Sequence, residues 1–518
     1  MSAPKLPTLR VSGPLGAALS AEALAQIGSA QLAAFLLQRR WFGGKGRAPS
    51  SVRIGDVVDI REGDAHHVVA RLDVQVGGRT AFYQLPLAVR RDEGESPGAG
   101  LARVETDGGE RGILFDAVED ERFRRALGRA FARGATFGGR ARWIVEPVEG
   151  ESERPDPGEL PSRTVRAEQS NTSIIFGEAA IMKLFRRMEP GINPDVEIGR
   201  FLTTKTHFTH TPRLLGVVRY EGSGDVRAIA GMLQGFLPAS RDAWQDALER
   251  SRAFFAAEDA DESAHPFARD AEQLGRVTRE LHDALASARD DGDFVPRSAT
   301  ADDVARWVQS ARRRMEEATT LLAERVEAGA IHDEGQARAL VERREADLAH
   351  LDELAASIGS DAGQLVRHHG DYHLGQVLRT REGDFQIIDF EGEPARPLAE
   401  RRERNSALRD VAGMLRSFSY AAATLASEQR GKSPARAMDE RAAIWERGAR
   451  SAFLRGYLSG GPAAFLPANQ QRVDALLELF EMEKVYYEMS YELNNRPEWV
   501  WIPINGAAAL RSTPAGRS

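Results

Sequence analysis

Three residues in one short segment have the types and spacing that phosphoryl transfer requires. The segment HHGDYHLGQVLRTREGDFQIIDFEGEP, residues 368–394, contains Asp371, then Gln376, then Asp389. A carboxylate in a loop can take the proton of a hydroxyl nucleophile, while an amide oxygen and a second carboxylate can share a magnesium ion. The spacing therefore favours a phosphotransferase site.

A β-hairpin is predicted to bring these side chains together. Val377 to Thr380 is predicted as one strand, residues 381–384 as its turn, and Phe385 to Phe390 as the returning strand. The loop before the hairpin and the residues after it would then be neighbours.

The alternative is a buried hairpin whose Asp and Gln residues only cap turns. Ile387 and Ile388 form a short apolar run, typical of a strand buried on both faces, which would deliver Asp389 and Glu391 beside a glycine. Two acids at the end of a buried strand are costly without a cation or hydrogen-bond donors. This context favours catalysis over turn capping.

The composition limits the classes of function. A chain of 518 residues predicts about three domains or lobes, and 42% hydrophobic residues can build sizeable cores. With 69 basic and 77 acidic residues the net charge is −8, which argues against a nucleic-acid partner and favours a small molecule. The absence of cysteine excludes disulfides, thiolate zinc sites and cysteine nucleophiles, and suits a reducing compartment.

No membrane or export segment is expected. No stretch reaches the run of about 18 apolar residues that a membrane span needs. The alanine-rich N-terminal stretch is interrupted by Glu22 and lacks a strongly apolar region, so a signal peptide is not predicted. We expect a cytoplasmic protein without a membrane partner.

The N-terminal part is predicted as a small α+β unit. Residues 21–40 have a helical apolar face, and strands are predicted at Val52 to Ile60, His67 to Val76 and Thr80 to Val89. Residues 92–100 are predicted as a loop or linker.

The segment RWFGGKGR, residues 40–47, lies between the helix and the strands. It lacks the Ser or Thr that follows the lysine of a nucleotide-binding loop, so that interpretation fails. A glycine turn above packed Trp41 and Phe42 is favoured, and a role for Arg40 or Lys45 between lobes stays open.

A hairpin further on is predicted to carry a functional lysine. Residues 111–135 are predicted as a helix and 151–162 as a polar loop, before strands at Thr172 to Phe176 and Ala180 to Phe185. Lys183 has apolar neighbours on the second strand, as either an edge residue or a phosphate ligand would.

The next helix, beginning near Pro194, presents Glu197. A carboxylate there could hold a phosphate-binding Lys183 through an ion pair, or be a solvated acid at a helix start. Ala228 to Phe236 is predicted as a strand leading into a hinge whose backbone could hold an adenine edge. From about residue 237 the chain is predicted to be mainly helical, and 301–357 a helical hairpin with solvated charge runs.

The order of these features resembles the protein-kinase-like fold, and the HGD form of the Asp371 loop is similar to the aminoglycoside-phosphotransferase branch. Longer strings resemble maltokinases: RWFGGKGR, QSNTSIIFGEAAIMKLFRRMEPGINPDVEIGRFL, HHGDYHLGQVL, IDFEGEP, LRDVAGMLRSFSYAA and YEMSYELNNRPEWVWIPI. This resemblance implies ATP-dependent phosphorylation of maltose at its anomeric hydroxyl, giving maltose 1-phosphate for α-glucan (glycogen) synthesis.

The implied fold class is α+β, a protein-kinase-like fold with a small β-rich N-lobe, a large mainly α-helical C-lobe and an additional N-terminal α+β cap. The implied division is a cap at 1–110, a nucleotide-binding N-lobe at 111–236 and a helical C-lobe at 237–518. ATP and Mg²⁺ would lie in the cleft between the lobes.

The resemblance also implies roles for single residues. Asp371 matches the catalytic base, Gln376 and Asp389 match magnesium ligands, and Glu391 is placed where it could support the metal. Residues assigned to the nucleotide are Lys183, its partner Glu197, Ser170, Asn171, Thr172, Ser173 and Gln234. Small polar residues at 170–173 replace the glycines of a protein-kinase phosphate loop, and their N–H and hydroxyl groups could bind phosphate.

Two further residues near the catalytic loop receive roles. Asp410, at a helix start, is expected to brace the loop. His373 could orient the loop, contact the phosphate or simply pack within it.

The C-terminal tail is the candidate sugar site. It offers flat aromatic faces for a pyranose and planar polar groups for paired hydroxyls, at Tyr487, Tyr491, Glu492, Asn495, Arg496 and Trp499. The pattern alone favours an aromatic core stripe on a helix, and the resemblance favours a sugar site.

Two other functions stay open. Relatives of this family are similar to glucosamine kinases, which would keep the site and change the acceptor. A non-catalytic pseudokinase scaffold, associated with a trehalose synthase, would lack a catalytic residue, yet Lys183, Asp371, Gln376 and Asp389 are all present.

Overall fold

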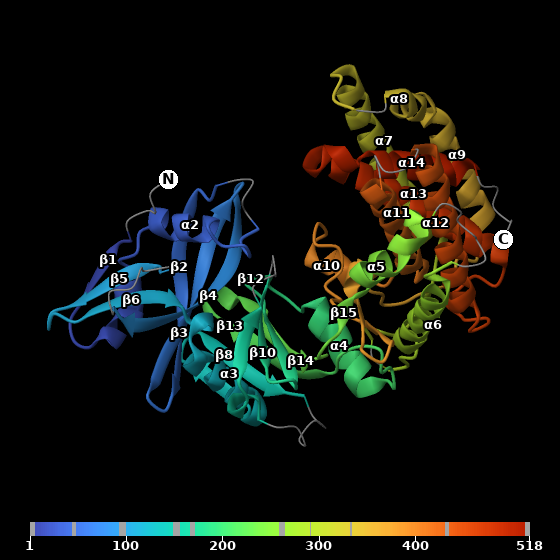
Figure 1. Cartoon of the computed structure of the whole chain (residues 1–518). Coiled ribbons are helices and arrows are strands. Elements are labelled where there is room, and N and C mark those ends of the chain that lie inside the picture. Colours follow the sequence, from blue (N-terminus) through green and yellow to red (C-terminus); the bar gives the residue numbers. More distant parts are fainter. Residues whose placement is uncertain are drawn as a thin grey trace. The chain divides into compact units, whose positions relative to one another are not determined.

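The computed structural model divides the chain into two compact units. One contains Met1–Arg200 and Pro212–Pro238, and the other contains Phe201–Thr211 and Ala239–Ser518 (Figure 1). The residues described are 6–43, 48–92, 100–148, 156–165, 171–257, 265–290, 292–331, 334–429 and 435–512. Lys45, Ser170 and most of the predicted loop at 92–100 lie outside these ranges.

The first unit begins with a seven-stranded sheet, here called the cap sheet. Its spatial order is β1 (Thr8–Val11), β5 (Ala102–Thr106), β6 (Arg111–Asp116), β4 (Arg79–Arg91), β3 (Ala65–Val76) and β2 (Ser51–Glu62), with β12 (Arg187–Met188) also paired to β4. The three predicted strands of this region are confirmed as β2, β3 and β4.

Two helices pack their apolar residues on the cap sheet. They are α1 (Ala21–Leu24) and α2 (Ser29–Leu37), and Leu24, Leu32 and Leu36 share a buried cluster with strand residues. The single helix predicted for 21–40 is wrong, because the extended backbone of Gly28, with ψ 156°, interrupts it.

The helix predicted for 111–135 is also wrong at its start. Residues Arg111–Asp116 form β6 between β4 and β5, because the apolar run from Ile113 fills a central position in the sheet. The helix is α3 (Glu121–Arg133), which begins where Asp120 accepts a hydrogen bond from Arg122 N.

A second sheet of seven strands completes the first unit. Its order is β7 (Ala135–Gly138), β8 (Arg142–Pro147), β13 (Leu214–Glu221), β14 (Arg227–Gly235), β11 (Ala180–Leu184), β10 (Thr172–Phe176) and β9 (Ser162–Val165). The predicted hairpin is confirmed as β10 and β11, and the predicted strand near 228–236 as β14.

The two sheets share one core and a buried polar network. Val58 and Ile60 of the cap sheet pack in a cluster with residues of the second sheet, including Trp143. Asp56 Oδ2 accepts from Tyr220 Oη at 2.6 Å and lies 2.6 Å from the guanidinium of Arg71. Because these groups are buried and paired, neither sheet can detach without exposing a charge.

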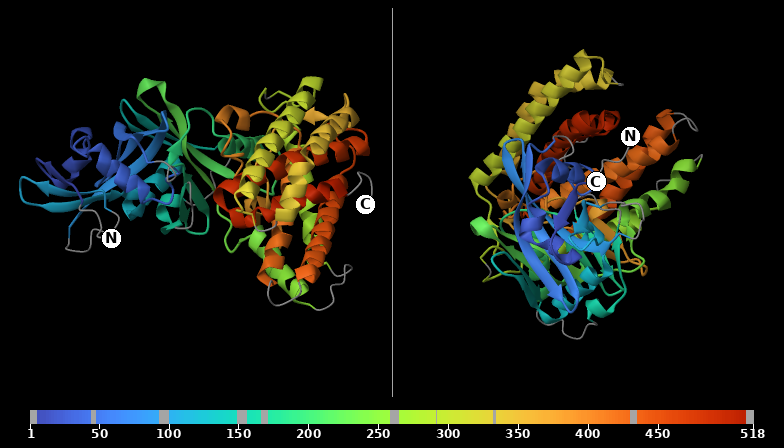
Figure 2. Two further views of the ribbon diagram at one scale, coloured as in Figure 1. Left: turned by 90° about the horizontal axis from the view of Figure 1, so that it is seen from above. Right: turned by 90° about the vertical axis from the view of Figure 1, so that its left-hand side faces the viewer.

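The second unit is mainly helical. Its longer helices run side by side (Figure 2) and are α5 (Ala243–Ala256), α6 (Ala268–Leu285), α7 (Ala301–Glu327), α8 (Glu334–Glu342), α9 (Arg344–Ile358), α11 (Leu408–Gln429), α12 (Ala435–Leu458), α13 (Gln470–Asn495) and α14 (Trp501–Ser512). A short helix α10 (Leu398–Arg401) and a two-stranded pair, β16 (Arg297–Ser298) with β17 (Gln364–Leu365), complete it. No helix in the described ranges is long and apolar enough to cross a membrane.

The predicted catalytic hairpin is confirmed as β18 (Val377–Arg379) and β19 (Phe385–Ile387), and β15 (Arg241–Asp242) adds a third strand. The returning strand is shorter than predicted. Ile388 is half-buried whereas Ile387 is fully buried, so the strand is not buried on both faces. The chain leaves the sheet before Asp389.

The prediction that the charge runs of 301–357 are solvated is wrong in part. Asp303 and Asp347 are buried at 1% and 0% exposure. Each is paired with an arginine, Asp303 with Arg297 and Asp347 with Arg343. These acids are therefore paired inside the second unit and are not solvated.

We predict that Asp56→Ala destabilises the first unit by about 3–5 kcal/mol, because Arg71 and Tyr220 lose a buried partner. Urea unfolding, with hydrogen exchange of the β3 and β13 amides as the local probe, measures the loss of stability. Asp64→Ala, at the exposed turn of the same hairpin, is the control and should change stability by less than about 0.5 kcal/mol. Equal stabilities of the two variants would contradict the prediction.

Candidate functional site

The carboxylate of Asp410 holds the loop that carries Asp371. Asp410 lies near the start of α11, is 1% exposed, and accepts from His369 N at 2.7 Å and Gly370 N at 2.9 Å. Its Oδ2 also lies 3.1 Å from His282 Nε2. The predicted bracing role is confirmed.

The environment keeps this carboxylate charged. Burial by itself would raise the pKa of Asp410, but the hydrogen bond from His282 and the nearby histidines hold that pKa well below its ordinary value. A charged acceptor strengthens the two backbone hydrogen bonds that define the loop.

His369 connects the loop to the end of the hairpin. Its Nε2 lies 2.9 Å from Ile388 O, and its Nδ1 accepts from Asp371 N at 3.4 Å. The carbonyl acceptor requires the tautomer with a proton on Nε2. Gly370 between them has φ +83°, a conformation that favours glycine.

Asp371 is half-buried next to a cation. Its side chain is 24% exposed, and its Oδ1 lies 3.6 Å from Lys484 Nζ of α13. The next residue, Tyr372, is buried, and its hydroxyl is 2.8 Å from Thr278 Oγ1 of α6. The loop is thus anchored on both sides of a carboxylate that solvent can reach.

Gln376 lies at the start of the hairpin. Gln376 O accepts from Ile388 N at 3.0 Å, which places it beside the residue that precedes Asp389. His373 caps the turn ahead of it, with Nδ1 accepting from Gly375 N at 3.1 Å. Burial lowers the pKa of His373, so the ring is neutral around pH 7.

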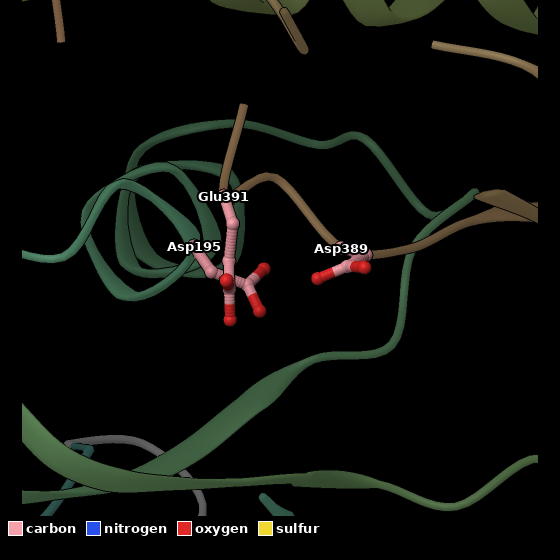
Figure 3. A group of neighbouring side chains, drawn as sticks. All are labelled: Asp195, Asp389 and Glu391. Carbon is pink, nitrogen blue, oxygen red and sulfur yellow. The ribbon is translucent and has the colours of Figure 1, made fainter. Parts of the chain in front are cut away.

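Asp389 and Glu391 follow β19 (Figure 3). Asp389 has φ +69°, which is uncommon for a residue with a side chain and is maintained only where the surroundings over-determine it. Arg401 Nη1 donates to Glu391 O at 3.2 Å. Gln376 and Asp389 are therefore at the same end of the hairpin, as the sequence predicts.

Lys183 of the first unit is paired with an acid of α4 (Pro194–Lys205). Its Nζ lies 3.0 Å from Asp195 Oδ2, and the Asp195 side chain is fully buried. Sequence reasoning assigned that partnership to Glu197, in the same helical turn, and missed Asp195. The role of Glu197 stays a prediction.

The residues assigned to the nucleotide lie on different faces of the second sheet. Ser173 is directly opposite Lys183 in the β10–β11 register, so the two share a face. Thr172 Oγ1 instead accepts from Arg186 Nε at 2.7 Å. Gln234 of β14, 4% exposed, lies opposite Ile181 of β11 and so is on the same face as Lys183, and Asn171 immediately precedes β10.

A cavity next to Asp371 is lined by charged residues that the sequence analysis did not select. Its lining includes Arg314, Glu393, Arg396, Arg409, Glu483 and Lys484. Arg396 Nε donates to Glu393 Oε2 at 2.7 Å, and Arg409 Nη1 lies 2.9 Å from Glu483 Oε2. Arg409 holds the pKa of Glu483 below its ordinary value although burial opposes this.

Signals for these residues existed in the sequence. Glu393 belongs to the string IDFEGEP, and Lys484 lies one helical turn before Tyr487. Arg314 was hidden in a charge run that was interpreted as solvated, and its guanidinium lies 4.6 Å from the Tyr487 ring centre.

The predicted tail residues divide into two groups. Tyr487 lines the cavity beside Asp371. Glu492, 1% exposed, pairs with Arg496 at 2.7 Å and accepts from Tyr420 Oη at 3.0 Å. Around that pair, Tyr491 and Trp499 each lie 5.4 Å from the Arg496 guanidinium, and Asn495 donates to Tyr491 O at 2.8 Å. Binding of sugar by these residues stays a prediction.

Comparison with solved structures defines the fold. A glucosamine kinase in complex with glucosamine, ADP and inorganic phosphate aligns with a TM-score of 0.64 at 23% identity, covering 94% of this chain and 98% of that chain. A second glucosamine kinase structure, crystal form B, aligns with a TM-score of 0.66 at 22% identity, covering 94% and 99%. The kinase-like α+β fold with an added N-terminal cap is confirmed.

Sequence comparison defines the family. Residues 35–120 match the maltokinase N-terminal cap domain. The glucosamine kinase of Streptacidiphilus jiangxiensis is 30% identical over 461 residues, covering 88% of this chain and 90% of that protein. The glucosamine kinase of Mycolicibacterium smegmatis is 28% identical, covering 67% and 79%. The chain belongs to this maltokinase-like family of sugar kinases.

We predict that the second unit loses stability as pH falls from about 6.5 to 4. Burial lowers the pKa of His368 to about 4, despite the nearby charge of Asp410. The unfolded chain therefore binds a proton in this range that the folded unit rejects, which costs on the order of 3 kcal/mol. Urea unfolding at pH 7, 5.5 and 4 measures this loss.

His368→Gln should weaken that pH dependence, while His207→Gln, at an exposed position, should retain it in full. The same slope in His368→Gln as in the unchanged protein would show that other groups cause the acid sensitivity.

Proposed function

We propose that the protein transfers the γ-phosphoryl group of ATP to the anomeric hydroxyl of maltose, giving maltose 1-phosphate for α-glucan (glycogen) synthesis. The observation that carries the proposal is the geometry of Asp371, a solvent-accessible carboxylate on a loop held by Asp410. Family membership and a solved relative with bound ADP and inorganic phosphate support it.

In this reaction the sugar hydroxyl oxygen attacks the γ-phosphorus. The bond from that phosphorus to the β–γ bridging oxygen breaks, and ADP leaves with the electron pair. Asp371 accepts the hydroxyl proton. The rate depends mainly on positioning and on charge stabilisation, because such transfers need little covalent chemistry from the protein.

Residues of the first unit bind the nucleotide in the proposal. Lys183 contacts the phosphates, and its ion pair with Asp195 fixes the position of the ammonium group. Ser173 shares the face of Lys183. Ser170, Asn171, Thr172, Glu197 and Gln234 complete the assigned set.

The donor set at the end of the hairpin fits Mg²⁺. Gln376, Asp389 and Glu391 offer amide and carboxylate oxygens, which this hard cation prefers, and Asp389 has the uncommon left-handed backbone that often occurs at functional sites. When bound, magnesium would offset negative charge on the ATP phosphates.

The charges around Asp371 favour a neutral acceptor. Lys484 is 3.6 Å from Asp371, and Glu393 and Glu483 already have arginine partners. Maltose has no charge and needs no counter-ion among these paired groups, and Tyr487 offers a flat face for one of its rings.

Glucosamine is the second candidate acceptor. Both sequence relatives named above are glucosamine kinases, and one covers 88% of this chain. In that case His373 and the tail residues would recognise the amino sugar. The proposal also places the reaction in the cytoplasm and includes an association with a trehalose synthase.

A panel of sugars with ATP and Mg²⁺, followed by phosphorus NMR of the product, tests the acceptor. We expect turnover with maltose and a product phosphorus that couples to an anomeric proton. If glucosamine is turned over instead, to a phosphate ester at another hydroxyl, the acceptor is glucosamine and not maltose. ATP hydrolysis at background with every sugar would instead support the non-catalytic scaffold.

We predict that Asp371→Asn folds normally and loses about three or more orders of magnitude in kcat, because the proton acceptor is removed. Coupled measurement of ADP release gives the rate, and circular dichroism checks the fold. Asp384→Asn, in the exposed turn of the same hairpin, is the control and should keep the original rate. Near-normal turnover of Asp371→Asn would reject the assignment.

A further inference from the structure

The first unit contains a cavity that borders Asn171 and Thr172 of the assigned nucleotide set, but whose other lining residues have no role in the proposed reaction. It measures about 490 Å³ and lies between the cap sheet and strands β9 and β10. Its lining includes Arg39, then Arg40 and Trp41, which begin the segment RWFGGKGR, and Arg90 of β4. Asn171 and Thr172 complete the wall on the side of the second sheet.

Three arginines of this cavity are held against aromatic rings. The guanidinium of Arg39 is 3.8 Å from the ring centre of Phe35, that of Arg186 is 4.8 Å from Trp41, and that of Arg90 is 5.2 Å from Phe115. Stacking uses the flat face of a guanidinium and leaves its N–H edge for a ligand. The cations are therefore pre-positioned.

One nitrogen of the Arg186 guanidinium donates no hydrogen bond to any residue in the described part of the chain. The residue is 2% exposed, Nε donates to Thr172 Oγ1 at 2.7 Å, and Nη2 donates to Asp116 Oδ2 at 2.7 Å. Nη1 is buried and has no hydrogen-bond partner among the residues described. A buried donor without an acceptor is costly, so the charge of Arg186 is only partly satisfied by its two protein partners and would be stabilised by a nearby anion.

The charge balance of the lining defines the sign of that group. Arg39, Arg40, Arg90 and Arg186 face only two acids, Asp116 and Glu119, among the described lining residues. Burial lowers the pKa of Arg39, and the nearby Arg186 adds to that effect while Asp116 opposes it. An anion in the cavity would relieve the repulsion between these guanidinium groups.

We propose that this cavity binds a phosphate monoester of a small molecule, such as a sugar phosphate. A phosphate dianion offers paired oxygens to the planar edges of Arg186, Arg39 and Arg90. The volume suits a ligand the size of a phosphorylated sugar. Because Arg186 hydrogen-bonds Thr172, the first residue of β10, the occupant contacts the strand that follows the predicted phosphate loop.

The site is tested by calorimetric titration of the full chain with inorganic phosphate, glucose 6-phosphate and glucose, in the presence of saturating ADP. We expect glucose 6-phosphate to bind in the millimolar range or tighter and glucose not to bind. Binding of inorganic phosphate alone would identify a free-anion site and overturn the monoester assignment. No binding of either phosphate probe, or binding that only occurs without ADP, would overturn the proposal.

Variants locate the binding. Arg186→Lys keeps the charge and loses the planar edge, and Arg90→Gln removes an exposed guanidinium from the same cavity. Each should weaken glucose 6-phosphate binding about tenfold, the effect of losing one charge-assisted contact. Arg79→Gln, exposed at the other end of β4, is the matched control and should bind as the unchanged protein does.

Thermal unfolding of each variant checks the fold, since Arg186 pairs with Asp116. If Arg186→Lys does not fold, Arg90→Gln decides the outcome. Unchanged affinity in folded Arg90→Gln, or equal losses in Arg90→Gln and Arg79→Gln, would place the binding elsewhere.

Discussion

The buried carboxylate of Asp410 is the constraint on which the candidate catalytic loop depends. It accepts the backbone N–H groups of His369 and Gly370, and its own charge is maintained by His282. His369 in turn fixes the end of the hairpin, because its Nε2 lies 2.9 Å from Ile388 O. One charged group therefore positions both the candidate base and the backbone that leads to the predicted metal ligands, over a short chain of hydrogen bonds.

Buried ion pairs along α13 perform a similar task for the cavity. Carboxylates of this helix meet arginines of neighbouring helices, as Glu481 meets Arg450 and Glu488 meets Arg416. Such pairs contribute little net stability, because desolvation offsets their attraction, but they allow only one arrangement of the helices. Lys484, on the same helix, is thereby held beside Asp371.

The cap sheet is structurally continuous with the strand that carries Lys183. The chain leaves β11 and pairs β12 with β4, and Gln84 Nε2 donates to Phe185 O at 2.7 Å. Moving the cap would break these hydrogen bonds and expose the core that contains Val58 and Trp143. A ligand held by Arg186 would therefore act on a rigid connection between the cap and the hairpin that we propose binds the nucleotide.

The sequence by itself determined the hairpins and the identity of the chemical groups, because turn residues and strand alternation are local. Asp371, Gln376, Asp389 and Lys183 could be selected for that reason, whereas the kinase-like fold with its cap was implied by resemblance to a known family. The break at Gly28 was not predicted, because the apolar pattern continues across it. Strand β6 was not predicted, because a helical apolar pattern also suits a strand that neighbouring strands cover. Only the tertiary structure decided which polar groups meet: Asp195 with Lys183, Lys484 with Asp371, and Arg186 with Thr172. Such partners are separated in the chain, and one helical turn can offer two candidates, as Asp195 and Glu197 do for Lys183. Burial selects between such candidates, and no local sequence pattern encodes burial.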